Sequence, residues 1–339
     1  MNGKSESIAV IGAGSWGTAL GILLARHGNR VRIWGHETEA MRQLQAEREN
    51  RHYLPGIPFP DTLEPMLGLA ETLDGTREIL IVVPSHAFTS VLEQIHRLNP
   101  EPASLSWATK GLEPGRRRLL HEAASEVFPN TSLAVVSGPT FAMEVARGLP
   151  TAVTVASPDP EHAGRLAGYL HGDTFRAYTA SDITGVEVGG AAKNVMAIAA
   201  GISDGLGFGA NARAALITRG LAEITRLGLA LGGEHDTFMG LAGLGDLVLT
   251  CTDNQSRNRR MGLALAEGHS IQEAREAIGQ EVEGLAAARD FRLKADELGV
   301  EMPITQAVFK VLYEGLEPGA AVKSLLARDP REEQESRSA

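Results

Sequence analysis

The sequence predicts an α/β fold in which a doubly wound parallel sheet is followed by an all-helical region. The chain has 339 residues, which is more than one hydrophobic core usually holds, so two domains are expected. In the first half, short runs rich in β-branched residues alternate with longer helical patterns, as in strands joined by crossover helices. From Ser181 onward this alternation stops, and Gly- and Ala-rich segments with helical spacing follow.

The expected elements follow the chain in order. Runs rich in β-branched and aromatic residues predict strands at 7–11, 30–34, 78–83, 103–109, 132–136, 152–156 and 174–178. Glycine clusters are expected to interrupt the helical region at 205–211, 231–236 and 240–246. We therefore expect one domain over 1–182, a second over 183–327, and a polar, charged and disordered tail over 328–339.

Composition excludes several classes of protein. A formal net charge of -10 and a pI near 5.5 argue against binding to nucleic acid or to a membrane surface, both of which need basic patches. No run approaches the length of a membrane span, the N-terminus has no secretory pattern, and a cytoplasmic protein without membrane insertion is expected. The single cysteine, Cys251, is expected to be a buried thiol, and no His, Cys or acidic cluster has metal-ligand spacing.

The first motif indicates a Rossmann-type dinucleotide site. "GAGSWG" follows the first expected strand and opens a helix, so Gly12, Gly14 and Gly17 fit the pattern G-x-G-x-x-G. Gly12 allows the tight turn, Gly14 lets the backbone approach a pyrophosphate, and Gly17 permits close packing of helix on sheet. The pyrophosphate would lie at the N-terminus of the helix.

The end of the second expected strand leaves the choice of cofactor open. Enzymes that use NAD usually place an acid there to bind the ribose 2′-hydroxyl. Here the strand ends in "IWGHE", with Gly35 and His36 at the turn and Glu37 beyond it. Since Arg32 or His36 could accommodate a 2′-phosphate, the cofactor is expected to be either NADPH or NADH.

Two other strand ends carry candidate ligand groups. The carboxyl ends of parallel strands are where ligands bind in open α/β sheets. Lys110 follows one such strand, either as a cation aimed into the crevice or as an ordinary surface lysine. Gly138, Pro139 and Thr140 follow another and are expected to open a helix, where free N–H groups would either bind an anion or simply be capped.

A second cluster lies in the helical region. The glycine-rich segment 240–245 ends at Asp246, which would either contribute to a site or cap the next helix. Ser256, Arg257 and Asn258 open another helix and combine a hydroxyl, a guanidinium and an amide with free N–H donors, a set that suits a phosphate. Surface charge on an ordinary helix is the alternative for these three residues.

Lys193 stands in a helix made almost wholly of small side chains. It shares one face with Val186, Gly189, Gly190, Ala197 and Ala200 at helical spacing, and these small neighbours leave room for another backbone or a ligand. The simple interpretation is a lysine that extends its ammonium to water. Together with a nucleotide site and a phosphate anchor, however, this lysine predicts hydride transfer to a small phosphorylated carbonyl compound.

These motifs resemble the bacterial NAD(P)-dependent glycerol-3-phosphate dehydrogenase family. The resemblance spans about residues 7 to 320 and rests on "GAGSWGTAL", "NRHYLPG", "TKGLE", "SGPTFAMEV", "GGAAKNVMAIAAGISDGLGFG", "GLAGLGDL" and "QSRNRR". It implies an N-terminal Rossmann-type domain followed by a helical domain. It also implies cofactor contacts at Ser15, Trp16, His36, Tyr53, Lys110, Ala142, Arg257 and Glu283, and substrate contacts at Lys110, Gly138, Thr140, Lys193, Asp246, Ser256, Arg257 and Asn258.

The resemblance implies a reaction as well. Lys193 would be the acid/base that protonates dihydroxyacetone phosphate during its reduction to sn-glycerol 3-phosphate with NADPH or NADH. Its small neighbours would admit the substrate and lower its pKa, and Asn194 and Asp246 would orient the ammonium or the substrate hydroxyls. Two positions depart from the family pattern: Glu281 replaces a small aliphatic residue, and His36 stands where arginine is common.

The resemblance further implies a role in glycerophospholipid synthesis and a homodimer. Two alternatives stay open at this point. A related 3-hydroxyacid-type dehydrogenase would share the architecture, but it usually carries Asn four residues after the lysine, where this chain has Ala197. A nicotinamide-nucleotide sensor without catalysis would have little need for Lys110, Lys193, Asp246 and Arg257 together.

Overall fold

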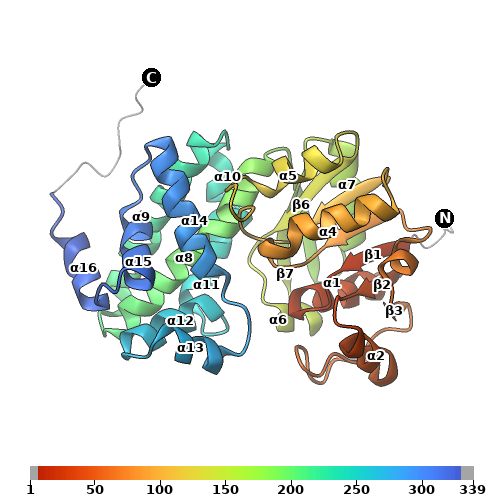
Figure 1. Cartoon of the computed structure of the whole chain (residues 1–339), viewed down its shortest axis with the longest axis horizontal. Coiled ribbons are helices and arrows are strands. Elements are labelled where there is room, and N and C mark those ends of the chain that lie inside the picture. Colours follow the sequence, from red (N-terminus) through yellow and green to blue (C-terminus); the bar gives the residue numbers. More distant parts are fainter. Residues whose placement is uncertain (1–6, 330–339) are drawn as a thin grey trace.

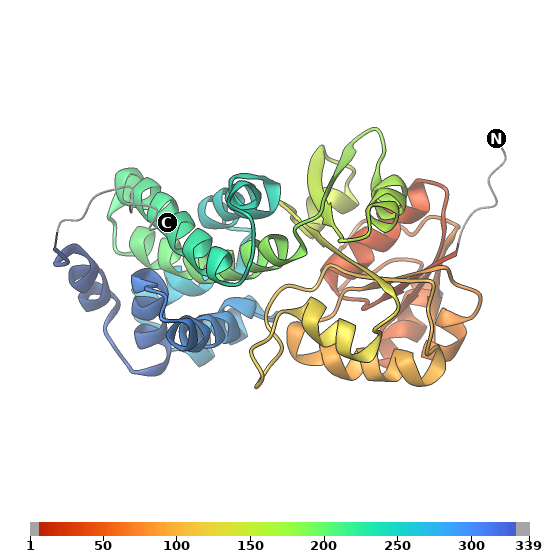
Figure 2. The same cartoon turned by 90° about the horizontal axis from the view of Figure 1, so that it is seen from above.

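The structure is a computed structural model that describes residues 7–329, and it has two halves that lie side by side (Figures 1 and 2). The N-terminal half is an eight-stranded sheet with strand order β3-β2-β1-β4-β5-β6-β7-β8. Its strands are β1 (Ser7–Ile11), β2 (Arg30–Trp34), β3 (Leu63–Met66), β4 (Glu78–Ile81), β5 (Ser104–Trp107), β6 (Ser132–Ser137), β7 (Thr151–Ala156) and β8 (Phe175–Ala180). All seven predicted strands are confirmed, with shifts of a few residues at their ends.

Helices cover both faces of the sheet. They are α1 (Ser15–Arg26), α2 (Thr38–Glu47), α3 (Leu69–Leu73), α4 (Ser85–Leu98), α5 (Leu120–Val127), α6 (Ala142–Ala146) and α7 (Pro160–Leu170). Alternate residues of β1 enter different cores: Ile8 and Val10 pack with α1 and α7, whereas Ala9 and Ile11 pack with α3, α4 and α5. The predicted doubly wound fold is confirmed by this arrangement.

Two details of the sheet correct the prediction. The sequence reading missed β3, an edge strand that contains Pro65, because proline cannot donate to a ladder and weakens the strand signal. The sheet was expected to be parallel throughout, but β6 and β7 pair antiparallel. The connection between them holds only the five-residue helix α6, which is too short to carry the chain back along the sheet for a parallel start.

The C-terminal half is all-helical, as predicted. It contains α8 (Ile183–Gly205), α9 (Gly209–Ala230), α10 (His235–Met239), the π-helical turn η1 (Leu241–Gly245), α11 (Asp246–Thr252), α12 (Arg257–Ala266), α13 (Ile271–Ile278), α14 (Glu283–Leu298), α15 (Pro303–Tyr313) and α16 (Pro318–Leu326). None of the helices within residues 7–329 is long and apolar enough to cross a membrane. Of the tail predicted to be disordered, residues 330–339 lie outside the described part of the chain.

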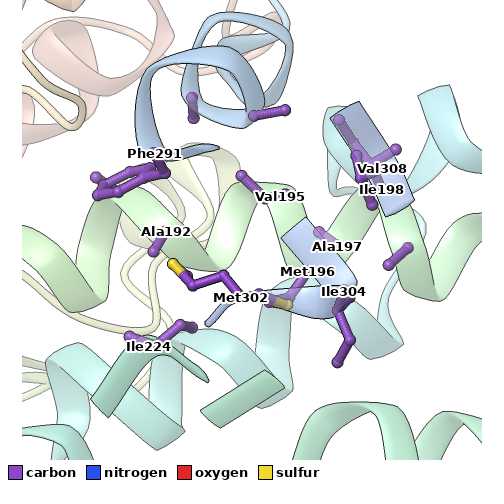
Figure 3. Close-up of a cluster of buried hydrophobic side chains, with 14 of the residues drawn as sticks. Ala192, Val195, Met196, Ala197, Ile198, Ile224, Phe291, Met302, Ile304 and Val308 are labelled. Carbon is purple, nitrogen blue, oxygen red and sulfur yellow. The ribbon is translucent and has the colours of Figure 1, made fainter. Parts of the chain in front are cut away.

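Helix α8 is the buried axis of this half. Its residues from Gly185 to Ser203 are all buried, and Figure 3 shows side chains of α8 near Phe291 of α14, Ile304 of α15 and Met302, which precedes α15. A β-carbon on Gly201 would lie 2.1 Å from the carbonyl oxygen of Arg259, and one on Gly262 would lie 2.1 Å from that of Ile198. The backbones of α8 and α12 are therefore in direct contact.

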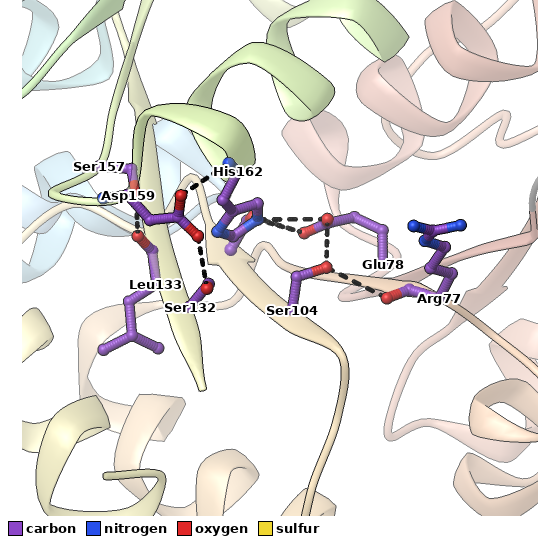
Figure 4. A network of polar contacts seen from close by, with 9 residues as sticks. Arg77, Glu78, Ser104, Ser132, Leu133, Ser157, Asp159 and His162 are labelled. Atoms are coloured by element: carbon purple, nitrogen blue, oxygen red, sulfur yellow. Dashed lines mark hydrogen bonds and ion pairs between the residues drawn. The ribbon is translucent and has the colours of Figure 1, made fainter. Parts of the chain in front are cut away.

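A closed polar cluster lies at the amino ends of the central strands (Figure 4). Glu78 and His162 are 1% and 0% exposed, and the His162 Nε2 lies 3.2 Å from both oxygens of the Glu78 carboxylate. Ser104 and Ser106 donate their hydroxyls to the same carboxylate at 2.6 and 2.5 Å. We call Glu78, Ser104, Ser106 and His162 the amino-end cluster.

Candidate active site

A cavity of about 320 Å³ opens between the two halves, beyond the carboxyl end of β5. Side chains from the sheet half and from the helical half line it together. Among the residues predicted from the sequence, the lining includes Ser15, Trp16, Tyr53, Lys110, Thr140, Ala142, Lys193, Ser256, Arg257, Asn258 and Glu283. Gln280 also lines the cavity, whereas the neighbouring Glu281 is exposed and does not.

Lys193 and Lys110 meet on one buried carboxylate. The Lys193 ammonium donates to Asp246 Oδ1 and, at 2.8 Å, to the Thr250 hydroxyl. The Lys110 ammonium donates to Asp246 Oδ2 at 2.7 Å. Asp246 is fully buried and Lys193 is only 6% exposed, so the interpretation of Lys193 as a lysine extended to water is wrong. We call Lys110, Lys193, Asp246 and Thr250 the lysine cluster.

The surroundings of Lys193 lower its affinity for a proton. Burial is the largest effect and lowers its pKa to about 8, and the charge of Lys110 acts in the same direction. The Asp246 carboxylate opposes both by attracting the ammonium. A lysine with a pKa near neutrality exchanges protons with a reacting group far more readily than an ordinary surface lysine.

Close packing sets Asp246 beside Lys193. A β-carbon on Gly189 would lie 2.7 Å from the carbonyl oxygen of Ala242, so α8 receives the backbone of η1, the turn that leads directly into Asp246. A β-carbon on Gly190 would lie 2.4 Å from the Ser137 hydroxyl. Protein atoms therefore occupy the space beside both glycines. The prediction of another backbone there is confirmed at Gly189, and the expectation that these two glycines admit substrate is wrong. Asp246 does not cap α11, since both of its oxygens bind lysines.

Hydrogen bonds hold the start of α12 in place at the cavity. Ser256 caps the helix by accepting from the Arg259 N–H at 3.2 Å. Asn258 donates to Asn194 at 2.9 Å, and Asn194 donates to Glu283 at 3.2 Å. Asn194 therefore joins α8 to the starts of α12 and α14, and its side chain bonds these residues instead of the lysine ammonium. Since Asn194 also lines the cavity, its contact with the substrate hydroxyls stays a prediction.

The Arg257 side chain takes no part in these hydrogen bonds. It lines the cavity, and no hydrogen bond or ion pair joins its guanidinium to another residue within 7–329. The guanidinium and the first N–H groups of α12 are therefore able to bind an anionic group of a ligand.

The glycine motif has the backbone geometry that a nucleotide site requires. Gly12 has a φ of 126°, and a β-carbon there would lie 2.1 Å from the carbonyl oxygen of Val82. A β-carbon on Gly17 would lie 1.9 Å from the carbonyl oxygen of Gly12. Beside Gly14 there is open space, and no side chain caps the N-terminus of α1. The motif thus leaves one face of the turn free for a phosphate to approach.

The turn after β2, where the sequence left the choice of cofactor open, differs in part from expectation. Arg32 donates to the backbone carbonyls of Glu71 and Asp74 near the end of α3, and it does not line the cavity beside Gly14 and His36. His36 has an 86% exposed side chain and lines a separate cavity of about 410 Å³ together with Gly14 and Tyr53. No carboxylate follows β2 directly, which leaves the choice between NADPH and NADH open.

The loop after β6 differs from the predicted structure in one respect. Gly138, Pro139 and Thr140 were expected to open a helix, but α6 begins only at Ala142. Gly138 has a φ of 156°, and a β-carbon there would lie 2.9 Å from the Cα atom of Val153, so this glycine lets β6 and β7 approach each other. Thr140 and Ala142 reach the cavity instead.

Two family models match the chain over most of its length. The model described as the NAD-dependent glycerol-3-phosphate dehydrogenase N-terminus matches residues 7–163, and the one described as the C-terminus matches residues 182–323. The chain belongs to the NAD-dependent glycerol-3-phosphate dehydrogenase family. This confirms the resemblance that the motifs indicated.

Individual relatives of this dehydrogenase family are similar along their whole length. A glycerol-3-phosphate dehydrogenase (NAD(P)+) of Pectobacterium atrosepticum is 55% identical over 335 residues, which cover 98% of this chain and 99% of the relative. That of Aliivibrio fischeri is 54% identical over 329 residues and 96% of each chain. A crystal structure of glycerol-3-phosphate dehydrogenase from Coxiella burnetii has a TM-score of 0.93 at 51% identity, covering 96% of this chain and 99% of the other.

The sequence did not reveal two sets of contacts, one beside the cavity and one between the two halves. Thr250 binds the Lys193 ammonium, and its position four residues after Asp246 in α11 places both side chains on one helix face, a signal that was present in the sequence. Glu187 and its partners Trp107 and His121 join the two halves, and no local pattern in the sequence pairs them. Within the described residues, no group of three or more His, Cys, Asp or Glu side chains could hold a metal ion.

Proposed function

We propose that the protein reduces dihydroxyacetone phosphate to sn-glycerol 3-phosphate with NADPH or NADH, and that Lys193 is the proton donor. The observation that carries this proposal is the lysine cluster, in which the ammonium groups of Lys110 and Lys193 share the Asp246 carboxylate. The start of α12, with the Arg257 guanidinium, lines the same cavity and offers donors for a phosphate. The names of the relatives support the reaction and the cofactor class.

The cofactor would be held by the turn at Gly12, Gly14 and Gly17 and by the uncapped N-terminus of α1. When bound, the nicotinamide nucleotide supplies the hydride. Ser15, Trp16, Tyr53, Ala142, Arg257 and Glu283 line the cavity on the path from this turn to Lys193 and are proposed as further contacts, with Lys110 and His36.

The protein's own residues would carry the remaining steps. Arg257 and the N–H groups at the start of α12 bind the substrate phosphate, while Ser256 and Asn258 hold that helix end in place. Lys193 and Lys110 polarise the carbonyl oxygen. Lys193 would release its proton to that oxygen and become a neutral amine, and Asp246 would hold the Lys193 ammonium in position before this transfer.

The roles of the two domains, the location of the protein, its oligomeric state and its metabolic role are also proposed. Residues 1–182 would bind the nucleotide and residues 183–327 would bind the substrate and carry the catalytic lysine. The protein would act in the cytoplasm as a homodimer and would supply glycerol 3-phosphate for glycerophospholipid synthesis. Neither nucleic acid nor a metal ion takes part.

The test is an absorbance assay of NADPH and NADH oxidation, run in parallel with dihydroxyacetone phosphate. Lys193→Ala should lower kcat on the order of 10²- to 10⁴-fold, the usual contribution of a positioned general acid. Lys323→Ala, at an exposed lysine of α16, is the matched control and should leave kcat unchanged.

Two results would contradict the proposal. Wild-type turnover in Lys193→Ala would remove the acid/base role. No oxidation of either cofactor with this substrate would favour the two alternatives, which a 3-hydroxyacid substrate would then separate, since only the hydroxyacid dehydrogenase would turn it over.

A further inference from the structure

Glu187 is a buried charge of the helical half whose hydrogen-bond partners belong to the sheet half. It lies near the start of α8 and is 5% exposed. Its Oε1 accepts from the Trp107 indole N–H at 3.0 Å and from the His121 backbone N–H at 3.1 Å. Its Oε2 contacts the His121 Nδ1 at 2.7 Å. Three hydrogen-bond contacts thus join one carboxylate of the helical half to the sheet half, across the interface that we call the seam.

These partners lie close along the chain to the lysine cluster. Trp107 ends β5, and Lys110 follows in the same segment. Lys193 lies further along α8, about 9 Å from Glu187 at 1.5 Å of rise per residue. Glu187 therefore holds the helix that carries Lys193 against the strand that leads into Lys110, beside the ion pair between Lys110 and Asp246 that also joins the two halves.

The other described contacts of α8 across this seam are of a different kind. Gly190 packs on Ser137 of β6, and Val186 is buried in the core on one face of the sheet. Neither contact is a hydrogen bond, so both limit how closely the halves approach but allow sliding. Hydrogen bonds to a buried carboxylate have a preferred direction and are costly to leave unmade.

We propose that Glu187 is a positioning residue, and that its contacts with Trp107 and His121 set the register of Lys193 against Lys110. This inference rests on the proposed function for its kinetic consequence. Its structural consequence stands without substrate, because a loosened seam would let water reach Lys193. Since burial is the main cause of the low Lys193 pKa, that pKa would then rise toward the ordinary value for lysine.

The test compares Glu187→Ala with Glu187→Gln in the full chain. The glutamine oxygen accepts from both N–H donors, and its amide faces the His121 Nδ1, which accepts in the other tautomer. We expect Glu187→Ala to lower kcat by about ten- to a hundredfold, as small misplacements at reacting groups do. The KM for dihydroxyacetone phosphate should change less, and Glu187→Gln should restore kcat to near wild type.

The second readout is the Lys193 pKa, measured without substrate by NMR of ¹³C-labelled lysine side chains, with Lys193→Ala to assign the signal. It should rise in Glu187→Ala and stay near 8 in Glu187→Gln. If the wild-type protein failed to reduce dihydroxyacetone phosphate, the proposed function would fail, and this measurement would still decide on Glu187.

Glu223→Ala is the matched control for a purely structural effect. Glu223 is a carboxyl of the same half, 3% exposed, that accepts from the backbone N–H groups of Ile304 and Thr305 at the start of α15, which belongs to the same half. We expect this variant to lower the melting temperature but to leave kcat and the Lys193 pKa unchanged. An unchanged kcat and Lys193 pKa in Glu187→Ala, or a failure of Glu187→Gln to restore them, would overturn the proposal.

Discussion

The amino-end cluster and the lysine cluster lie at opposite ends of β5 and bury their charges differently. In the amino-end cluster one carboxylate, Glu78, is matched by two hydroxyls and one imidazole and has almost no exposure. In the lysine cluster two cations share Asp246, which leaves one positive charge in excess beside a cavity. Burial alone therefore does not mark a site; an uncompensated charge next to an opening does.

The largest expected effect is on the free energy of unfolding. A variant of Glu78 tests whether the amino-end cluster contributes to stability but not to turnover. Glu78→Ala should lower the free energy of unfolding by about 3–5 kcal/mol, because it removes the carboxylate that two buried hydroxyls and the buried His162 imidazole contact. Urea unfolding followed by circular dichroism would measure this. The kcat/KM of the folded protein should not change; a loss as large as that in a lysine-cluster variant would abolish the distinction between the clusters.

Asp246→Asn tests the lysine cluster in the same way. We expect kcat/KM to fall on the order of 10²-fold, about 2.7 kcal/mol, because Lys193 loses the charge that holds its ammonium. Since the Asp246 charge raises the Lys193 pKa, the alkaline limb of the rate profile should also move to lower pH. Asp290→Asn, another buried carboxyl, is the control and should leave that limb in place.

The pH dependence of the wild-type enzyme sharpens the comparison further. In the reducing direction Lys193 must carry its proton, and its pKa is about 8. The kcat/KM for reduction should therefore be level below that pH and fall about tenfold, or 1.4 kcal/mol, for each pH unit above it. A fall that begins only near the ordinary lysine pKa would show that burial does not tune this group.

The smallest effect concerns Thr250. Thr250→Val removes the hydroxyl that accepts from Lys193 while keeping the shape of the side chain. The loss of one hydrogen bond should cost about 1 kcal/mol, or about fivefold in kcat/KM. Steady-state kinetics of this variant beside Thr250→Ser, which should stay near wild type, would detect it, and equal rates for both variants would exclude a role for the hydroxyl.

Local signals explain what the sequence predicted. Strand runs, the roles of Gly12 and Gly17, the burial of Cys251 and the candidates Lys110, Lys193 and Asp246 all depend on residue type and near neighbours. Each is visible in a window of a few residues, because periodicity and turn chemistry act over that range.

The misses depend on partners far apart in the chain. Asn194 binds Glu283, Arg32 binds the carbonyl of Asp74, and Glu187 binds Trp107, and none of these pairs leaves a trace in sequence spacing. The direction of β7 was missed for a related reason, since strand direction depends on how the connection crosses the sheet.

The contact between α8 and α12 has a consequence for how the protein tolerates change. Gly201 and Gly262 do not line the cavity, but any side chain at either position would wedge apart the helices that carry Lys193 and Asn258. In a saturation-mutagenesis screen these two positions should accept no substitution, as strictly as Lys193 itself. A map of intolerant positions would therefore extend along this helix pair, well beyond the atoms that meet a substrate.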